Sequence, residues 1–402
     1  MRILLLTQYF TPEITAAPVR LHPFAAGLSR RGHEVEVVCE LPSHPQGIVH
    51  PGYGGRPTER RRLDGFEVTY VWTHASPSKR ARSRLLSYAS YAAMASAAAS
   101  LRRRPDVVLA SSPPLSVGAV GATVAARHRV PWVLDVRDLW PEVAVALGEI
   151  GPGRVLSVAE ALERRLYRSA DVITTPTEPF RDRIASRSPD PGKVEVVANG
   201  TTPEWLAAGE AEVDRGSLGI PADAFVWTYS GNVGLSQDLG TALSAAELLG
   251  EGFQLLIVGD GTSRPRMAER AAGLPAGAVR LTGLVEPADA ARYMRASDAL
   301  LVPLADEPAL GRSIPIKLYD CCAIGRPVVV AAPGEPRRVA EAAGAALTIA
   351  PGDPGALAEA VRRLRDDPAM ASELSASARR FAAEHLRERG VERLEGLLER
   401  LP

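Results

Sequence analysis

The sequence predicts an α/β protein made of two doubly wound, Rossmann-like domains. The chain has 402 residues, and a single hydrophobic core rarely grows beyond about 250 to 300 residues, so two domains are expected. Apolar residues make up 46% and charged residues 23% of the chain, which is typical of a globular protein. Short β-branched runs alternate with segments of helical periodicity, and this pattern indicates βα units around parallel sheets.

Apolar runs of three to five residues give the predicted strands in order. In the first half these are residues 3–6, 35–39, 68–71, 107–109, 132–134, 172–174 and 194–197. In the second half they are residues 225–229, 255–258, 279–281, 299–302 and 328–330. Helices are expected between them, for example where Leu21, Phe24 and Leu28 form an apolar stripe.

The polar run ANGTTPEW, residues 198–205, follows the last strand of the first half and predicts a hinge. The expected domains are therefore residues 1–200 and 201–380, followed by a terminal segment, residues 381–402. If the two sheets face each other, the carboxyl ends of their strands meet at one central cleft. Ligands bind at such ends in this class of fold, so functional residues should follow strands.

Charge is unevenly distributed although the formal net charge is zero. Residues 1–105 hold fifteen Lys and Arg against seven Asp and Glu. Nucleic acid is nevertheless not expected as a partner. Basic residues flank an alanine-rich stretch, residues 85–101, that is too polar for a good membrane span. They are Lys79, Arg80, Arg82, Arg84, Arg102, Arg103 and Arg104. The stretch predicts peripheral contact with an anionic membrane, or a crossover helix with solvated charges, and both can hold.

The three cysteines, Cys39, Cys321 and Cys322, have neither a disulfide framework nor a metal-ligand spacing. They are interpreted as buried thiols of a cytosolic protein. The N-terminus MRILLLTQYF passes directly into a strand without a cleavage-site pattern, so no signal peptide is predicted. A cytoplasmic location is expected, with any membrane contact at the inner face of the plasma membrane.

Two common chemistries lack their motifs. The first strand runs into TQYFTPEITAAPVR, which contains no glycine, so a nicotinamide dehydrogenase is not expected. The run VGDGTSRP, residues 258–265, is best interpreted as a tight strand-to-helix turn. There is no D-x-D pair and no His/Cys cluster, so no metal site is predicted.

The stretch YSGNVGLSQDL, residues 229–239, has the form of a phosphate-binding turn. It leaves an apolar strand, turns through Gly231 and Gly234 and enters a helix, so backbone amides could face an anion. It contains no Lys or Arg. The predicted source of positive charge is Lys317 in SIPIKLYD, because Pro315 suits the first position of a helix. Asp320 shares a helix face with Lys317, and an exposed ion pair is the alternative.

Taken in order, several motifs resemble the family 4 retaining glycosyltransferases, which have the GT-B fold. They include LLTQYFTPE, SSPPLSVG, DVRDLWPE, VVANG, YSGNVGLSQDL, LLIVGDG and PIKLYDCCAIGRPVVV. They are most similar to the branch of bacterial N-acetyl-L-fucosamine transferases of O-antigen and capsule assembly. The resemblance implies that the second domain binds a UDP-sugar as co-substrate, without a cofactor, and that the first binds the acceptor. It also implies that residues 381–401 form a helix returning to the first domain.

The resemblance also implies a set of donor-binding residues. These are Gly231, Asn232, Val233, Gly234, Gln237, Gly259, Leu284, Val285, Arg312, Ser313, Ile314, Lys317 and Asp320. Many family members have Arg and Lys near the positions of Asn232 and Gln237, and a carboxylate at that of Arg312. A contact to the donor sugar would then be rerouted, for example through the backbone amides of residues 309–313. Asp320 stands where the family usually has a ribose-binding Glu.

For the chemistry itself, the resemblance implies Lys317 together with Glu13, Arg137 and Asp138 of the first domain. Arg137 and Asp138 stand where related enzymes often have His-Asp, although Arg137 could equally form a structural ion pair. Glu142 is a further candidate. Glu13 is expected to orient the acceptor, and Arg20 either joins it or supports the contacts of its helix.

The function expected from these residues is transfer of an N-acetylated hexosamine or deoxyhexosamine from a UDP-sugar to an acceptor hydroxyl. The acceptor is either a polyprenyl-linked sugar of polysaccharide or glycolipid assembly, or a soluble natural product such as an antibiotic. Two other functions stay open: a UDP-sugar 2-epimerase, and a non-catalytic protein that keeps the fold.

Overall fold

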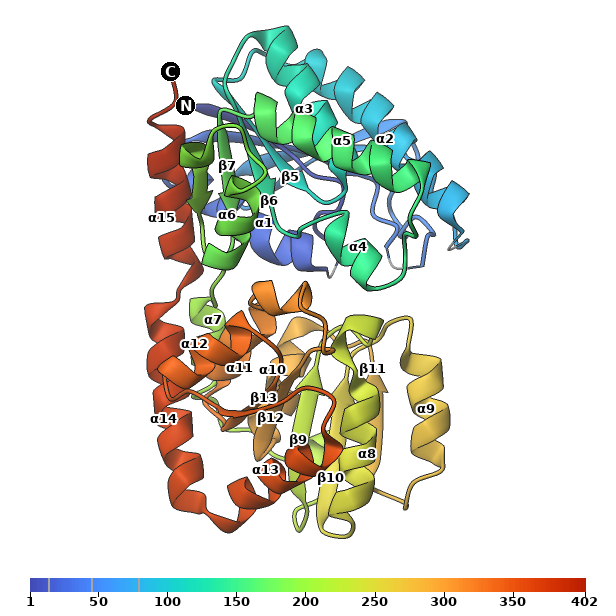
Figure 1. The fold of residues 1–402 in the computed structure, drawn as a ribbon, viewed down its shortest axis with the longest axis vertical. Helices are drawn as coiled ribbons and strands as arrows, with labels where there is room; N and C mark the ends of the chain where they lie inside the picture. The colour runs from blue at the N-terminus through green and yellow to red at the C-terminus, as the bar shows by residue number, and fades with distance from the viewer. Residues whose placement is uncertain (14, 45, 79) are drawn as a thin grey trace. The chain divides into compact units, whose positions relative to one another are not determined.

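The computed structural model describes residues 1–13, 15–44, 46–78 and 80–402, so Lys79 of the basic segment lies outside the described residues. Contacts within the chain divide it into two compact units (Figure 1). Unit 1 comprises Met1–Ala198 and Arg387–Pro402, and unit 2 comprises Asn199–Leu386. The sequence predicts one terminal helix from residue 381. The structure has two instead, because α14 (Pro368–Glu384) ends within unit 2 and α15 (Arg387–Leu398) belongs to unit 1.

Unit 1 is built on one eight-stranded sheet in the order β3-β4-β2-β1-β5-β6-β7-β8. The strands are β1 (Arg2–Leu6), β2 (Glu34–Glu40), β3 (Thr58–Leu63), β4 (Phe66–Val71), β5 (Val107–Ser112), β6 (Trp132–Val136), β7 (Val172–Thr175) and β8 (Val194–Val196). All neighbours pair in parallel except β3, which pairs antiparallel with β4. The predicted strands of this half are confirmed, and β3 is an addition.

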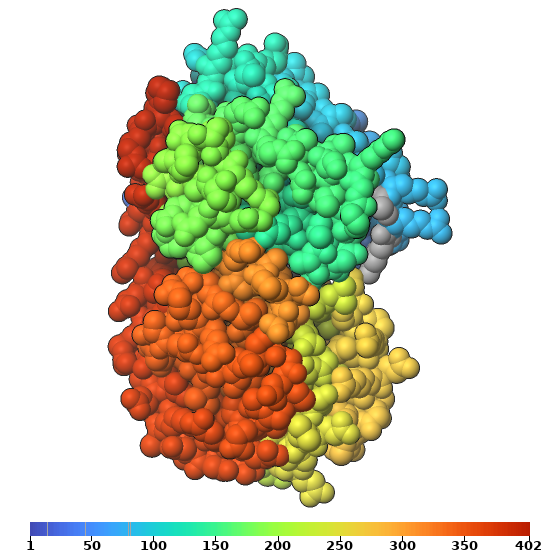
Figure 2. Space-filling view, in the orientation of Figure 1, coloured from blue at the N-terminus to red at the C-terminus, as the bar shows by residue number. Residues whose placement is uncertain are grey.

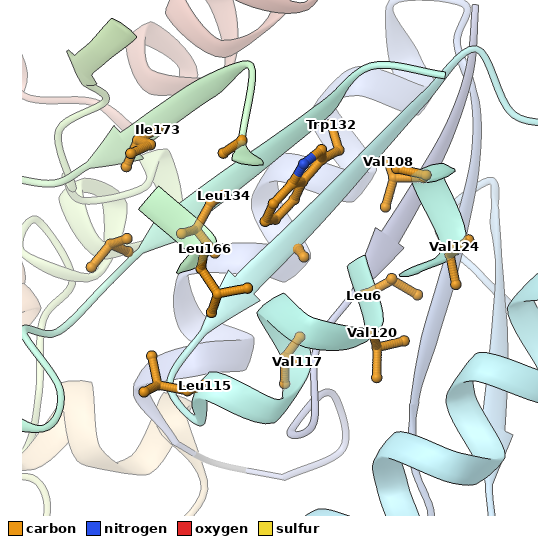
Figure 3. Close-up of a cluster of buried hydrophobic side chains, with 14 of the residues drawn as sticks. Leu6, Val108, Leu115, Val117, Val120, Val124, Trp132, Leu134, Leu166 and Ile173 are labelled. Carbon is orange, nitrogen blue, oxygen red and sulfur yellow. The ribbon is translucent and has the colours of Figure 1, made fainter. Parts of the chain in front are cut away.

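Helices cover both faces of the sheet of unit 1. They are α1 (Ala16–Arg30), α2 (Ala81–Ser100), α3 (Leu115–His128), α4 (Glu142–Ala146), α5 (Arg154–Ser169), α6 (Glu178–Ala185) and α15. Helices α2, α3 and α5 lie side by side, and α1 packs against α15 (Figure 1). Alternate residues of β1, β2, β4, β5 and β6 enter two separate hydrophobic clusters. Figure 3 shows one of them, where Val117 and Val120 of α3 pack among side chains of β1, β5 and β6.

Unit 2 is a six-stranded, all-parallel sheet in the order β11-β10-β9-β12-β13-β14. Its strands are β9 (Phe225–Ser230), β10 (Phe253–Val258), β11 (Val279–Gly283), β12 (Ala299–Pro303), β13 (Val328–Ala331) and β14 (Leu347–Ile349). Its helices are α7 (Pro203–Ala208), α8 (Leu239–Leu249), α9 (Arg264–Ala272), α10 (Pro287–Ala296), α11 (Ile316–Ile324), α12 (Glu335–Ala342), α13 (Pro354–Asp366) and α14. The predicted strands are again confirmed, with β14 in addition. The predicted fold class of two Rossmann-like α/β domains is therefore confirmed.

Candidate functional site

In unit 2 the strand order reverses between β9 and β12. The chain builds β10 and β11 on one side of β9, and then returns to add β12 on the other. The loops after these two strands are joined, since the Ala305 amide donates to the Ser236 carbonyl at 2.9 Å. Such a switch point opens a crevice at the carboxyl ends of the strands, which is where ligands bind in open α/β sheets.

Two glycines allow the turns after β9 and β10 to meet at this crevice. Gly231 has a φ of +137° and Gly259 a φ of +138°, both in the region that favours glycine. A Cβ atom on Gly259 would lie 2.0 Å from the Gly231 carbonyl oxygen. Both positions therefore require glycine, for close approach as well as for backbone conformation.

The turn after β9 differs from the expected open cradle of amides. The Gly231 amide donates to the Val258 carbonyl and the Val233 amide to the Asp260 carbonyl, each at 2.9 Å. The Gly234 amide donates to Oε1 of Gln237 at 3.1 Å. Three of the amides are thus used to fix the turn itself, and Gln237 is one of the groups that fix it. Positive charge for an anion must come from elsewhere.

Lys317 supplies that charge from the first turn of α11. The helix begins one residue later than predicted, at Ile316, with Pro315 at the position before it. The Lys317 Nζ donates to the Tyr229 hydroxyl at 2.5 Å and lies 4.0 Å from the centre of the Tyr229 ring. It reaches the glycine turn, because a Cβ atom on Gly231 would lie 2.9 Å from it.

Lys317 forms no ion pair with any carboxylate in the described part of the chain. The alternative of an exposed Lys317–Asp320 pair is therefore not what the structure shows. Asp320 is 8% exposed and accepts a hydrogen bond from the Thr201 hydroxyl at 2.9 Å. Burial lowers the pKa of the Lys317 ammonium to about 7, as expected for a cation held in the protein without a counter-charge.

The remaining residues predicted for donor binding lie in two other loops. Arg312, Ser313 and Ile314 lie in the loop between β12 and α11. Three amides of residues 309–313 are engaged within that loop: those of Leu310 and Gly311 donate to the Glu307 carbonyl, and that of Ser313 to the Leu310 carbonyl. These amides do not offer the predicted rerouted contact, because the loop uses them to close its own turn.

Leu284 and Val285 follow β11, next to the turn that carries Gly259. The Gly259 amide donates to the Gly283 carbonyl at 3.0 Å, which joins the two strand ends. Leu284 is 61% exposed, whereas Val285 packs against a small apolar cluster. The exposed Leu284 therefore directly follows a residue that is hydrogen-bonded to the turn carrying Gly259.

In unit 1 a buried ion pair that the sequence did not reveal lies under the carboxyl end of the sheet. Arg20 of α1 donates to both oxygens of Asp135 in β6, at 2.8 and 3.3 Å. Asp135 also accepts from the Ser111 hydroxyl at 2.6 Å and the Thr174 hydroxyl at 2.9 Å. Burial opposes ionisation, but Arg20 and these hydrogen bonds hold the pKa of Asp135 below its usual range. Arg20 is therefore a buried partner of the sheet.

Arg137 holds the end of β5 in place. Its Nε donates to the Ser111 hydroxyl at 2.8 Å and its Nη2 to the Pro113 carbonyl at 2.7 Å. Next to it, burial raises the pKa of Asp138 to about 6, although Arg137 opposes that rise. Two predicted residues therefore lie together after β6, and one of them is a carboxyl group whose pKa suits proton transfer near neutral pH.

Glu13 is tied to the loop that follows β2. Its Oε1 accepts from the Ser43 and His44 amides, each at 2.8 Å, and burial raises its pKa to about 7. Glu13 lies close enough to Glu40 of β2 to raise its pKa, and Glu40 accepts from the side-chain amide of Gln8 at 2.8 Å. Glu13 thus fixes a loop at the strand ends.

Glu142 of α4 belongs to a network of ion pairs with Arg183 of α6 and with Arg187, which follows α6. It lies 2.9 Å from Arg183 and 3.4 Å from Arg187.

Among the described residues, His33, Glu395 and Glu399 lie close enough together to hold a metal ion. His33 is already paired with Glu395 at 2.8 Å. Within the described ranges, no helix is long and apolar enough to cross a membrane.

The fold and the strand-end switch point define a class, namely proteins of two Rossmann-like domains, and the comparisons with known proteins identify it as the GT-B fold. The chain matches the structure of Anabaena HepE in complex with UDP-glucose with a TM-score of 0.72, at 17% identity and over 99% of both chains. Residues 15–200 match the "Glycosyl transferase 4-like domain" and residues 225–367 match "Glycosyl transferases group 1". The chain belongs to glycosyltransferase family 4 of the GT-B superfamily.

Two curated relatives show the range of this family. The chain is 25% identical over 283 residues to the putative colanic acid biosynthesis glycosyl transferase WcaI of Escherichia coli (strain K12), covering 67% of this chain and 69% of that protein. It is 29% identical over 342 residues to the 2-deoxystreptamine glucosyltransferase of Streptomyces kanamyceticus, covering 81% and 86%. The protein is thus a glycosyltransferase with relatives in both cell-envelope and natural-product glycosylation.

Proposed function

We propose that the protein transfers a sugar, with retention and without a metal ion, from a UDP-sugar bound by unit 2 to an acceptor hydroxyl bound by unit 1. The observation that carries this proposal is the Lys317 ammonium, held at the strand-end crevice of unit 2 without a carboxylate partner in the part of the chain that the structure describes. A diphosphate is the natural counter-ion for such a cation. HepE, which shares the fold, was solved with UDP-glucose.

In this proposal the chemistry depends on charge stabilisation at the leaving group. As the bond from the sugar to the diphosphate breaks, negative charge grows on the diphosphate and the sugar becomes oxocarbenium-like. Lys317 and the positive end of the α11 helix dipole stabilise that growing charge. A diphosphate oxygen on the same face receives the acceptor proton, which gives retention. Lys317 thus takes the role that a divalent cation has in metal-dependent transferases.

The proposed donor sugar is an N-acetylated hexosamine or deoxyhexosamine, following the resemblance to N-acetyl-L-fucosamine transferases. Two acceptor classes follow from the relatives. WcaI supports a polyprenyl-linked sugar in polysaccharide assembly, and the 2-deoxystreptamine enzyme supports a soluble natural product. Assays with both acceptor classes and one donor separate these two.

A thermal-shift screen of nucleotide sugars is the direct test of the donor class. A ligand at 100 times its Kd stabilises the folded state by about 2.7 kcal/mol, which moves the melting temperature by several degrees. UDP and UDP-sugars should stabilise the protein, equally with and without EDTA. Stabilisation by no nucleotide, or only in the presence of a divalent ion, would contradict the proposal. Incubation of UDP-N-acetylglucosamine without acceptor distinguishes a 2-epimerase, which alone would change it.

Peripheral contact with an anionic membrane is also proposed, through the start of α2. Arg80 and Arg82 are exposed there, and Leu85 and Leu86 are 56% and 55% exposed. This segment projects from the surface of unit 1 in light blue (Figure 2). Basic and apolar side chains together favour an anionic lipid surface. The protein should sediment with phosphatidylglycerol vesicles but not with phosphatidylcholine vesicles. A Leu85→Ser/Leu86→Ser variant should sediment with neither. Equal sedimentation of both proteins would contradict this contact.

A further inference from the structure

Tyr229, the fifth residue of β9, connects Lys317 of α11 with the glycine turn that follows β9. Its side chain is fully buried. The Lys317 Nζ donates to its hydroxyl at 2.5 Å, and the hydroxyl donates to the Asn232 carbonyl, also at 2.5 Å. We propose that Tyr229 is a positioning residue that holds the Lys317 ammonium at the glycine turn for the donor diphosphate. This inference rests on the proposed function.

The direction of both hydrogen bonds is fixed by chemistry. An ammonium can only donate and a carbonyl can only accept, so the hydroxyl between them must accept from Lys317 and donate to Asn232. One hydroxyl therefore fixes both the position of the ammonium and the conformation of the turn that contains Gly231 and Asn232. The face of the Tyr229 ring, 4.0 Å from Nζ, adds a cation–π attraction.

The partner is neutral, and this distinguishes Tyr229 from an ordinary partner of a buried lysine. A buried cation with a purely structural role is normally paired with a carboxylate, since an unpaired charge is costly. Tyr229 orients the ammonium without neutralising it, and the lowered pKa of Lys317 is in keeping with that. Because Gly231 has no side chain, the space between its Cα atom and the Lys317 Nζ is not filled by a Cβ atom.

If Tyr229 acts through Lys317, its hydroxyl should affect recognition of the diphosphate and not of the nucleoside. Calorimetric titration with uridine and with UDP separates the two. Tyr229→Phe keeps the ring and should weaken UDP binding about tenfold, the usual effect of losing a hydrogen bond to a charged group. Uridine binding should stay within about twofold of wild type.

A double-mutant cycle then tests whether the effect passes through the ammonium. Lys317→Met removes the charge but keeps most of the side chain, and it should weaken UDP binding more than Tyr229→Phe does. In the Lys317→Met background, Tyr229→Phe should add less than about twofold. Tyr293→Phe is the matched control, because it removes a tyrosine hydroxyl from α10 of the same unit, and it should leave both affinities unchanged.

The possible results separate this inference from the proposed function. Wild-type protein that binds no nucleoside diphosphate would overturn both. Wild-type protein that binds UDP, together with additive losses in the cycle or equal losses for uridine and UDP, would overturn only the role of Tyr229. Melting curves check that the variants fold. If Tyr229→Phe does not fold, Tyr229→Met fills the same strand position without a hydroxyl, and the same pattern is expected from it.

Discussion

The two units each hold a cation near the carboxyl end of a parallel sheet, buried in the case of Arg20 and half-buried in that of Lys317, but they treat its charge differently. In unit 1, Arg20 meets Asp135, whose oxygens also accept from Ser111 and Thr174. In unit 2, Lys317 meets the hydroxyl and ring of Tyr229 and pairs with no carboxylate among the described residues. The first charge is neutralised within the fold and the second is not. A neutralised buried charge supports the architecture, whereas an oriented and unpaired one is what the proposed diphosphate site requires.

The choice of side chain fits the two roles. A guanidinium has a rigid, planar set of donors that matches both oxygens of a carboxylate, as Arg20 does with Asp135. An ammonium is a compact point charge whose pKa shifts readily on burial, as in Lys317. The difference between the units can therefore be tested by removing one charged group at a time.

The largest expected effect is on stability, in unit 1. Asp135→Ala leaves the buried Arg20 guanidinium without its counter-ion, and this should cost about 3 to 5 kcal/mol of unfolding free energy. Urea denaturation monitored by circular dichroism measures it. Ser111→Ala removes one neutral donor to the same carboxylate and should cost about 1 kcal/mol. If Asp135→Ala costs less than about 1 kcal/mol, the ion pair does not neutralise a buried charge and the comparison fails.

The next effect is on activity, in unit 2. Lys317→Ala should lower kcat/KM by about two orders of magnitude, or about 3 kcal/mol, because a main charge-stabilising contact in the transition state is lost. Its melting temperature should fall less than that of Asp135→Ala, because Lys317→Ala leaves no buried counter-ion behind. Lys193→Ala, in unit 1, is the control for removing a lysine. Near-wild-type kinetics for Lys317→Ala would remove Lys317 from the site.

A smaller effect tests what happens to an unpaired buried carboxyl group. Burial, and then the nearby Glu13, raise the pKa of Glu40 from 4.5 to about 8. The folded state therefore holds this proton more tightly than the unfolded state. The resulting stability is fully present below pH 4.5 and is lost as the pH rises through about 8.

Glu40→Gln removes that pH dependence because the amide stays neutral. Relative to wild type, the variant should gain on the order of 2 kcal/mol between pH 6 and pH 8. Urea midpoints at the two pH values measure the difference. A wild type and variant with parallel pH profiles would show that Glu40 is ionised in the fold, and so that burial alone does not suppress its charge.

The smallest effect sets the scale for exposed charges. Arg337 and Glu341 form an exposed pair four residues apart on α12, at 2.7 Å. Arg337→Ala should change the unfolding free energy by less than about 0.5 kcal/mol, because water and salt screen the pair. A loss as large as that of Asp135→Ala would mean that burial is not what separates the two cases.

The fold could be predicted from the sequence wherever a strand is buried on both faces, because such strands are continuous apolar runs. The two missed strands lack that property. Thr58–Leu63 reads TERRRL, an edge strand with alternating exposed residues, and Leu347–Ile349 is only three half-buried residues long. Their strand conformation is imposed by a neighbouring strand and has no pattern of its own.

The candidate site was predictable in part, because functional loops follow strands. Lys317 could be proposed from the apolar run around it and the proline before it. Its contact with Tyr229, and that of Arg20 with Asp135, join residues 88 and 115 positions apart. No local pattern encodes such pairs. The engagement of Gln237 with the Gly234 amide was likewise invisible, since a glutamine can face a ligand or its own turn equally well.

The break between α14 and α15 bears on how the protein is made. The last helix contributes Val391, Leu394 and Leu397 to the same hydrophobic cluster as Leu21 and Phe24 of the first helix. During synthesis, the ribosome releases those residues only after all of unit 2 has been translated. The amino-terminal unit must therefore wait, with part of its apolar surface uncovered, until the residues of unit 2 have been made.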